Sequence, residues 1–292
     1  MEHQLWRSIV ALLPSLCESR TPARFDFDDT DIVAVYYWAV LHDRPTAWAC
    51  RAEHWQVGRR PGALPSPATM SRRLRSARVR RLLLALERRL TAPARPGLYW
   101  MIDGKPLPIG GCSKDRQAGY GRAAACKAKG YKIHAILNPQ GEIAAWRLAP
   151  MNKDERIMAE RLVKTTVLQG YLVADSNYDS NKLHEVCGRR DQLQLVTRRR
   201  YGPNHGTGHR KQTPGRIRSM QMTESPNRAF AEGLLAEMGE IERHFAHLTN
   251  WGGGLSCLPA WVRTHRRVHL WVQAKLVLTA LKRALKTTTY AA

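Results

Sequence analysis

Five short segments rich in apolar and β-branched residues restrict the fold more than any other feature of the chain. In order, they are residues 98–109, 129–137, 142–149, 171–175 and 192–196. Turn-forming residues separate the second from the third, and the first three together are typical of an antiparallel meander. A segment of helical periodicity precedes each of the last two, so we expect crossovers that place them parallel in the same sheet. The sequence therefore predicts an α/β fold with a mixed five-stranded sheet flanked by helices.

Proline and glycine residues at 91–97 mark a boundary ahead of these strands. Residues 1–95 carry helical patterns and no strand signal. We therefore expect an all-α N-terminal domain over 1–95, followed by the α/β domain over 96–292.

A short basic helix is predicted near the end of the N-terminal domain. Ser66 can cap it, and Pro67 takes the first helical position. A second amphipathic helix follows over 79–90. Two helices joined by a turn fit either a helix-turn-helix DNA-binding motif or a packing element with a solvated basic face. The candidate DNA contacts here are Arg72, Arg73 and Arg75.

The charge of the chain indicates a polyanionic partner. The 47 Lys and Arg residues outnumber the 24 Asp and Glu residues, which gives a formal net charge of +23. Residues 198–218 alone hold seven basic residues and no acidic one. Clusters of this kind attract the phosphates of nucleic acids. No segment is apolar for long enough to span a membrane and no signal-peptide pattern is present, so we expect a cytoplasmic protein with no membrane partner.

Two aspartates occupy special positions in the predicted sheet. Asp103 lies on the first strand, and Asp175 ends the fourth. In a sheet of this order the first strand can lie beside the fourth, which would make the two carboxylates neighbours. Adjacent like charges repel unless a cation lies between them, and Mg²⁺ prefers carboxylate oxygens. A lone aspartate at a strand end can also be a capping or turn residue.

A third carboxylate is expected on a long helix predicted over 227–248. Glu242 follows Met238 by four residues and precedes Phe245 by three, so we expect it on the buried side of the apolar stripe. Glu237 is the second choice. Two metal ions about 4 Å apart, held by such carboxylates, are typical of phosphoryl-transfer sites.

From about residue 98 to residue 285 the chain resembles the DDE transposase domain of bacterial insertion sequences, which has an RNase H-like catalytic core. The matching segments are MIDGKPLPI, GYKIHAILNPQGEIAAWRLAPMNKDE, LVADSNYDSNKL and IERHFAHL. The residues that match the family's patterns are Asp103, Asp175, Tyr178, Asp179, Ser180, Glu242, Arg243 and Phe245. The sequence departs from the family after the Glu, where LTNWGGG replaces a common Leu-Lys pair.

The resemblance implies a transposase that binds the ends of an insertion sequence and cuts and joins DNA strands by two-metal phosphoryl transfer. Asp103, Asp175 and Glu242 would be the catalytic residues and would hold two Mg²⁺ ions, with Mn²⁺ as a substitute. It also implies a homodimer on double-stranded DNA, at the transposon end and the target, and a bacterial protein associated with the nucleoid. The alternatives are a catalytically inactive DNA-binding derivative and a metal-dependent nuclease without strand transfer.

Further DNA contacts are expected close to the predicted metal site and in a basic insertion over 198–226. The candidates are Lys105, Lys129, Lys132, Tyr178, Arg198, Arg199, Arg200, Arg210, Lys211, Arg216, Arg218 and Arg243. The alternative for the basic residues is a solvated or structural role, and for Tyr178 it is packing.

Overall fold

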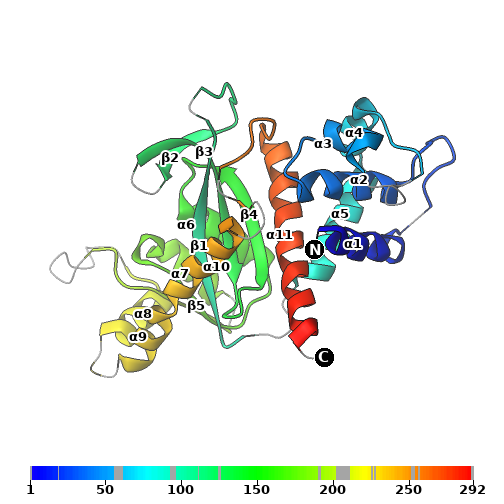
Figure 1. Ribbon diagram of the computed structural model, residues 1–292. Coiled ribbons are helices and arrows are strands. Elements are labelled where there is room, and N and C mark those ends of the chain that lie inside the picture. Colours follow the sequence, from blue (N-terminus) through cyan, green and yellow to red (C-terminus); the bar gives the residue numbers. More distant parts are fainter. Residues whose placement is uncertain are drawn as a thin grey trace. The chain divides into compact units, whose positions relative to one another are not determined.

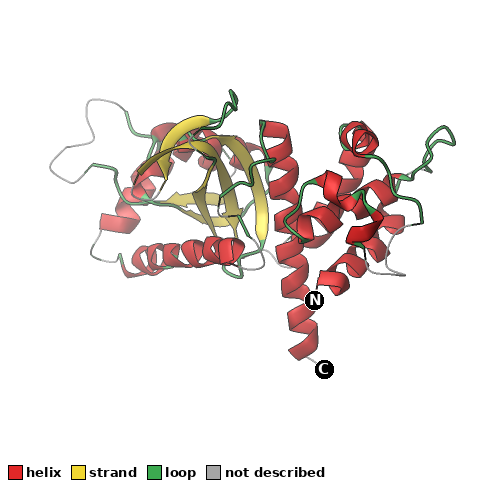
Figure 2. Ribbon diagram, turned by 45° about the horizontal axis from the view of Figure 1, so that its top comes forward, coloured by secondary structure: helices red, strands yellow, loops and turns green. Residues whose placement is uncertain are grey.

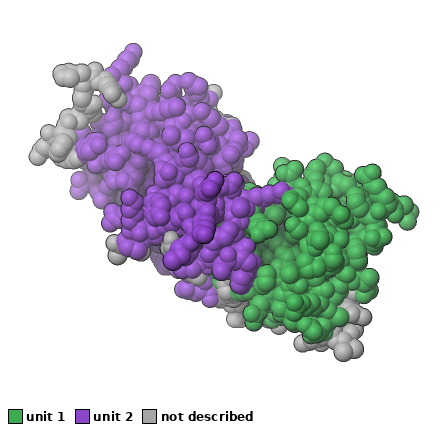
Figure 3. All heavy atoms as spheres, turned by 90° about the horizontal axis from the view of Figure 1, so that it is seen from above, with its two compact units in different colours: residues 1–92, 251–255, 267–292 green, residues 93–250, 256–266 purple. Residues whose placement is uncertain are grey.

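The computed structural model describes most of the chain, and its segments form two compact units. It describes residues 2–18, 20–55, 62–92, 97–110, 112–123, 126–189, 192–201, 211–224, 226, 228–250, 254–255, 257–290. One unit, which we call the helical unit, comprises 1–92, 251–255 and 267–292 (Figure 3). The other, the sheet unit, comprises 93–250 and 256–266.

The helical unit is built around one apolar helix. Its elements are α1 (Glu2–Leu16), α2 (Asp29–Leu41), α3 (Thr46–Ala49), the 3-10 helix η1 (Ala52–His54), α4 (Pro67–Arg73), α5 (Ala77–Thr91) and most of α11 (His265–Tyr290). α2 is buried from Ile32 to Leu41, because it is apolar on every side. The predicted cap of α4 is confirmed, since Ser66 Oγ accepts a hydrogen bond from Thr69 N at 3.1 Å. In the described part of the chain, no helix has both the length and the apolarity of a membrane span.

The C-terminal helix α11 groups with the helical unit, whereas the sequence placed it in the α/β domain. Gln273 Nε2 donates to Glu87 Oε2 at 2.6 Å, and the Lys275 ammonium pairs with Asp43. Both partners come from the first 92 residues. Helical periodicity shows that a helix has an apolar face, but it does not show which surface covers that face.

The sheet unit holds one mixed sheet, seen in Figure 1. Its strands are β1 (Tyr99–Pro108), β2 (Gly119–Ala123), β3 (Cys126–Leu137), β4 (Ile143–Pro150), β5 (Gly170–Val173) and β6 (Leu193–Val196). The order is β2-β3-β1-β5-β6, and β4 also pairs with β3. β3 is antiparallel to β1, β2 and β4, whereas β5 is parallel to β1 and β6. β1 therefore lies beside β5, as predicted.

The predicted fold class is confirmed, but the sheet has six strands where five were expected. The additional strand is β2, with the sequence GYGRA. Two glycines and an arginine in five residues give no strand signal. β2 forms because it pairs with the first part of β3, from Gly119 opposite Gly130 to Ala123 opposite Cys126.

Helices cover both faces of the sheet, as Figure 2 shows. They are α6 (Glu155–Thr165), the 3-10 helix η2 (Ser176–Tyr178), α7 (Asn181–Gly188), α8 (Pro214–Glu224), α9 (Ala229–Ala236) and α10 (Met238–Asn250). α6 and α7 pack on one face in a core that includes Ile102 and Leu172. α9 packs on the other face, where Leu234 lies in one cluster with Val173. The alternation of Leu172 and Val173 between the faces fixes which side of β5 each helix layer covers.

The region after β6 differs from its prediction. The long helix expected over 227–248 is two helices, α9 and α10, which meet at Glu237. The basic insertion expected over 198–226 contains α8, and its residues 202–210 lie outside the described part of the chain. The apolar stripe read across 227–248 is therefore not a single helical face.

Gly170 allows β5 to enter the sheet beside β1. Its φ is +84°, and a Cβ built on it would lie 2.0 Å from the backbone oxygen of Leu98. Its N–H donates to Gln192 O at 2.6 Å. Only glycine combines this backbone conformation with so close an approach. The register of β5 on β1, and with it the position of Asp175, depends on this residue.

We expect Gly170→Ala to lower the free energy of unfolding by about 2 kcal/mol or more, because a non-glycine residue at positive φ and a backbone clash both cost energy. Chemical denaturation measures the change. Gly110→Ala is the matched control, since a Cβ at Gly110 meets nothing within 4 Å. Equal stability of the two variants would contradict this role of Gly170.

Candidate functional site

The parallel pairing of β1 with β5 brings the two predicted aspartates together. The register pairs Met101 with Val173. The pairing ends there, and Asp103 and Asp175 each follow it by two residues. After burial, the charge of Asp175 is one of the causes that raise the pKa of Asp103, so the two carboxylates are close enough to interact. The expectation that these two carboxylates are neighbours is confirmed.

The Asp103 carboxyl has an unusual environment for an acid. Burial is the main cause that raises its pKa to about 7. The charges of Glu155 and Asp175 raise the pKa further, whereas the backbone N–H of Gly104 and the charge of Lys132 lower it. A group in this state gains from any nearby cation, because a cation stabilises the ionised form.

Asp175 is exposed and caps the turn that follows β5. Its Oδ1 accepts from Asn177 N at 2.9 Å, and its Oδ2 accepts from Asn177 Nδ2 at 3.1 Å. Its backbone oxygen accepts from Thr197 Oγ1 at 2.7 Å. Asp175 is thus held at the carboxyl end of β5 by its own turn and by the residue after β6.

Glu155 is a third carboxylate near Asp103, and the sequence analysis did not single it out. It is the first residue of α6 and pairs with the ammonium of Lys132. Its charge raises the pKa of both Asp103 and Tyr178. Its position at the end of the segment MNKDE, directly after β4, is the feature of the sequence that could have indicated a place near Asp103. An acidic first turn also suits any helix N-terminus, so the sequence alone did not distinguish the two roles.

Glu242 is exposed on α10, whereas we expected it on the buried side. The buried residues of α10 are Ile241, Phe245 and Leu248. The expectation extended the apolar stripe of α9 through Glu237, where the helix is in fact interrupted. The side chain of Glu237 is a hydrogen-bond partner of Tyr99. Among the described residues, no group of three or more His, Cys, Asp or Glu is arranged to hold a metal ion.

A buried ion pair fixes the turn that carries Asp175. Asp179, at the end of this turn, accepts two hydrogen bonds from Arg216 on α8, each 2.7 Å long. It also accepts from Arg200 N at 3.1 Å, and His184 Nε2 lies 3.5 Å from its Oδ1. These partners hold the pKa of Asp179 well below its usual value against the effect of burial. Residues after β6 therefore contact both ends of the turn.

Two predicted DNA contacts are interior residues. Arg73 is buried and donates to Asp29 Oδ1 at 2.8 Å and to Phe27 O at 2.9 Å. Tyr178 is 0% exposed and belongs to the core under α6 and α7. A structural role replaces DNA contact for both, because neither side chain reaches the surface.

Four further candidates pair with carboxylates of the sheet unit. The pairs are Lys132 with Glu155, Arg199 with Glu224, Arg216 with Asp179, and Arg243 with Glu240. The pair of Arg216 with Asp179 is structural, since the two side chains are 14% and 3% exposed. Exposed pairs such as that of Arg243 are worth little and can exchange their carboxylate for a phosphate.

The other candidates are exposed or half-buried, apart from Arg210, which lies outside the described residues. They are Arg72, Arg75, Lys105, Lys129, Arg198, Arg200, Lys211 and Arg218. Burial lowers the pKa of Lys105. Lys129 Nζ donates to Ser113 O at 2.8 Å. Each of these side chains is accessible enough to contact DNA.

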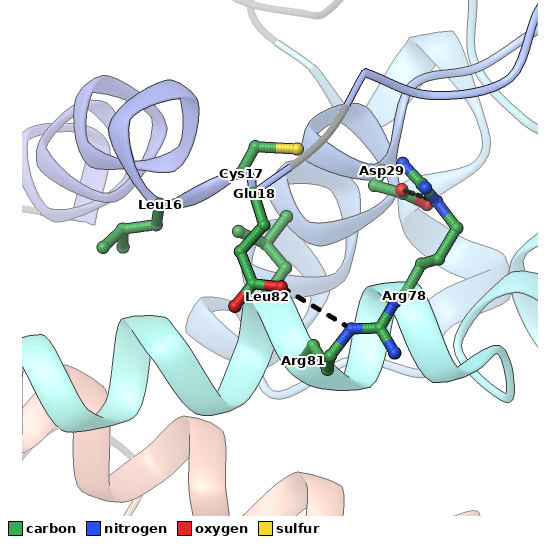
Figure 4. A pocket seen from close by; sticks show the side chains of 7 residues that line it. All are labelled: Leu16, Cys17, Glu18, Asp29, Arg78, Arg81 and Leu82. Atoms are coloured by element: carbon green, nitrogen blue, oxygen red, sulfur yellow. Dashed lines mark hydrogen bonds and ion pairs between the residues drawn. The ribbon is translucent and has the colours of Figure 1, made fainter.

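A hollow in the helical unit is lined by ion pairs, as Figure 4 shows. Arg78 Nε lies 2.8 Å from Asp29 Oδ2, and Arg81 Nε lies 3.8 Å from Glu18 Oε2. The charged groups of this hollow face one another. We interpret it as part of the packing of α5 on the residues around it.

His134 is a buried neutral histidine next to β1. It lies opposite Gly104 and is 1% exposed. Neither ring nitrogen has a hydrogen-bond partner among the described residues. Burial, with a smaller effect of the Lys132 charge, lowers its pKa to about 4. The imidazole is therefore uncharged at neutral pH.

The match to a family model agrees with the resemblance seen in the sequence. Residues 114–246, just under half of the chain, match the family model described as Transposase DDE domain. The match includes Asp175 and Glu242 and begins after Asp103. No curated protein matches the sequence. Among solved structures, a chain in the cryo-EM structure of the piggyBac transposase synaptic complex with hairpin DNA is 9% identical, with a TM-score of 0.48 over 99% of this chain and 74% of that chain.

We expect Asp179→Asn to cost about 3 kcal/mol of folding free energy, because it leaves Arg216 without its buried partner. Urea denaturation measures the loss. Arg218→Gln is the matched control on the same helix, since Arg218 is exposed. If Asp179→Asn were as stable as the control, the ion pair would not hold the turn.

We expect the stability of the protein to fall between pH 6.5 and about 4, in part because of His134. Its pKa is about 4 in the folded protein against an ordinary 6.5. The unfolded chain therefore binds more protons in this window, and stability decreases as the pH falls. His134→Leu should reduce this decrease by up to about 3 kcal/mol, measured by denaturation at several pH values. His247 is exposed, so His247→Leu should leave the loss of stability at low pH unchanged. If His134→Leu also left it unchanged, protonation of the buried His134 would not be a cause of that loss.

Proposed function

We propose that the protein cuts DNA at the ends of a mobile element and joins those ends to a target, on the premise that residues 114–246 match the family model described as Transposase DDE domain. The observation that carries the proposal is the pairing of β1 with β5, which puts Asp103 next to Asp175. A half-buried carboxylate on β1 close to the carboxylate that follows β5 is costly without a catalytic or metal-binding role.

The proposed chemistry is phosphoryl transfer in two related steps. A water molecule attacks a phosphodiester in line, and the P–O bond opposite it breaks to release a DNA 3′-hydroxyl. That hydroxyl then attacks a phosphodiester of the target, and the opposite P–O bond breaks there. Each step exchanges one P–O bond for another and forms no bond to the protein.

The donor set fits a hard divalent cation. Asp103 and Asp175 offer carboxylate oxygens, which Mg²⁺ and Mn²⁺ prefer. Burial and, to a smaller extent, the charges of Glu155 and Asp175 raise the pKa of Asp103, and a cation would oppose both effects. Two Mg²⁺ ions, when bound, would supply Lewis-acid activation of the attacking and leaving oxygens. Lys132 already lowers the pKa of Asp103 and so supports its ionised, metal-binding form.

The identity of the third ligand is part of the proposal. The resemblance assigns it to Glu242, which is exposed on α10. The alternation of side chains along β1 places Asp103 on the side of Tyr99, which packs with α9 and the first residue of α10. Asp103 and the helix of Glu242 thus share one face of the sheet. Glu155 is the competing ligand, because its charge already acts on Asp103.

Double-stranded DNA is the proposed substrate, at both the element end and the target. The net charge of +23 and the exposed cations after β6, such as Arg198 and Arg218, support it. Two ends must be cut and joined together, so a homodimer on DNA in the bacterial cytoplasm is proposed from the resemblance. A nuclease without strand transfer is the second candidate, because the same pair of carboxylates would serve it.

We expect Asp103→Asn and Asp175→Asn each to reduce DNA cleavage by about 10²- to 10³-fold or more, since each removes a carboxylate that would hold the divalent cation at the reacting phosphate. Cleavage of a labelled duplex carrying the element end, with Mg²⁺ or Mn²⁺, measures the effect. Both variants should keep their DNA affinity. Cleavage at the wild-type rate in either one would overturn the proposal.

A second set of variants separates the candidates for the third ligand. If Glu242 is the ligand, Glu242→Gln loses cleavage as Asp175→Asn does, whereas Glu155→Gln retains most of it. Glu240→Gln is the control on α10, where Glu240 pairs with Arg243. The opposite result, loss in Glu155→Gln alone, would transfer the role to Glu155. Strand-transfer products with a target plasmid distinguish a transposase from a nuclease.

A further inference from the structure

The hairpin of β2 and β3 has two unlike faces. Cross-strand pairs place Tyr120 opposite Lys129 and Arg122 opposite Lys127. Directly opposed residues share a face, and so do residues two apart on one strand. One aromatic and three cationic side chains therefore project from the same side of the hairpin, which we call the basic hairpin face. Figure 1 shows the hairpin extending beyond the rest of the sheet.

The opposite face of the hairpin is closed by the sheet unit itself. A Cβ on Gly119 would lie 2.1 Å from Asn152 Oδ1, and one on Gly121 would lie 2.5 Å from Met151 O. These glycines let the hairpin lie directly on the segment after β4. The hairpin is thereby fixed with its basic face turned outward.

The basic hairpin face is open to a ligand. Tyr120 is 57% exposed, and Arg122 and Lys127 are exposed. Neither of these two cations forms an ion pair with another residue that the structure describes. Lys129 is held in place, with Nζ bonded to Ser113 O at 2.8 Å and 5.9 Å from the centre of the Tyr120 ring.

This arrangement is unfavourable for the protein alone. Like charges directly opposite each other on two strands, here Arg122 and Lys127, destabilise a hairpin. The nearest acidic residue along the chain, Asp115, is buried and bonded to Tyr131, Gln117 and Thr264. A polyanion would remove the repulsion that no carboxylate of the hairpin offsets.

We infer that the basic hairpin face binds DNA, with Arg122 and Lys127 on backbone phosphates and Tyr120 stacked on an unpaired base. Cations along a backbone and an exposed aromatic ring beside them are the elements of single-strand recognition. The inference rests on the proposed function for one point, that the reaction acts on DNA. It goes beyond that function by assigning a binding surface away from Asp103 and Asp175.

The test measures binding without catalysis. Full-length protein carrying Asp175→Asn is titrated, without divalent cations, into two fluorescent DNA probes that have the same duplex sequence. One probe is blunt, and the other ends in a single-stranded overhang. Affinity is read by anisotropy over a range of salt concentrations. Because cleavage plays no part, failure of the catalytic proposal and failure of this inference give different results.

For the cations, the double variant Arg122→Gln/Lys127→Gln should bind both probes less tightly and reduce the slope of log affinity against log salt by about 2, one unit for each lost phosphate contact. The control Arg161→Gln/Arg189→Gln removes two exposed charges from α6 and the end of α7. A salt slope equal to that of the control would overturn the inference.

For the aromatic ring, Tyr120→Ala should bind the overhang probe about 10-fold less tightly and the blunt probe with little change, because stacking on an unpaired base is lost. Tyr120→Phe keeps the ring and should restore the affinity. An equal effect of Tyr120→Ala on both probes, or no effect on either, would exclude the stacked base. Thermal unfolding of each variant verifies that the hairpin remains folded.

Discussion

The pairing of β5 with β1 is the interaction on which the rest of the sheet unit depends. It joins Tyr99 to Tyr171 and Met101 to Val173, residues 72 apart in the chain. A parallel neighbour requires a crossover, which α6 provides, and a close backbone approach, which Gly170 permits. Once this register is set, Asp103 and Asp175 each follow the last paired residues by two positions, and α6 begins with Glu155, whose charge acts on Asp103. The carboxylates are thus neighbours because of main-chain pairing rather than any attraction between them.

The charged groups of the chain divide into two kinds with different physical roles. Asp179 with Arg216, and Asp29 with Arg73 and Arg78, are ion pairs in which the carboxylate is buried and each of its oxygens accepts a hydrogen bond. Removing one partner would leave a buried charge without compensation, so the role of these cations is to stabilise the fold. The exposed cations make no such contribution to stability, and an excess of them over acids raises the energy of the folded state through repulsion. An anionic partner offsets that repulsion, which is the physical basis for assigning the surface to DNA.

The turn from Asp175 to Asp179 connects these two kinds of charge. Its first residue faces the proposed reaction, and its last is bound by the guanidinium of Arg216 and the backbone of Arg200. The residues around the basic segment after β6 therefore support the carboxylate at the end of β5. Thr197, bonded to the backbone of Asp175, completes this support. The same set of hydrogen bonds therefore fixes the turn that carries Asp175 and the residues Thr197, Arg200 and Arg216 that follow β6.

The sequence by itself determined the strands with clear apolar patterns, the helix caps, the charge and the two aspartates at strand positions. These are local properties, since a strand, a cap such as Ser66, or the strand end at Asp175 is encoded within a few residues. Only the tertiary structure decided that β2 exists, that the helix breaks at Glu237, that Arg73 and Tyr178 are interior, and that Glu155 lies near Asp103. Each of these depends on contacts between residues far apart in the chain. Periodicity gives a side chain a direction on its own element, but only packing determines what it meets there.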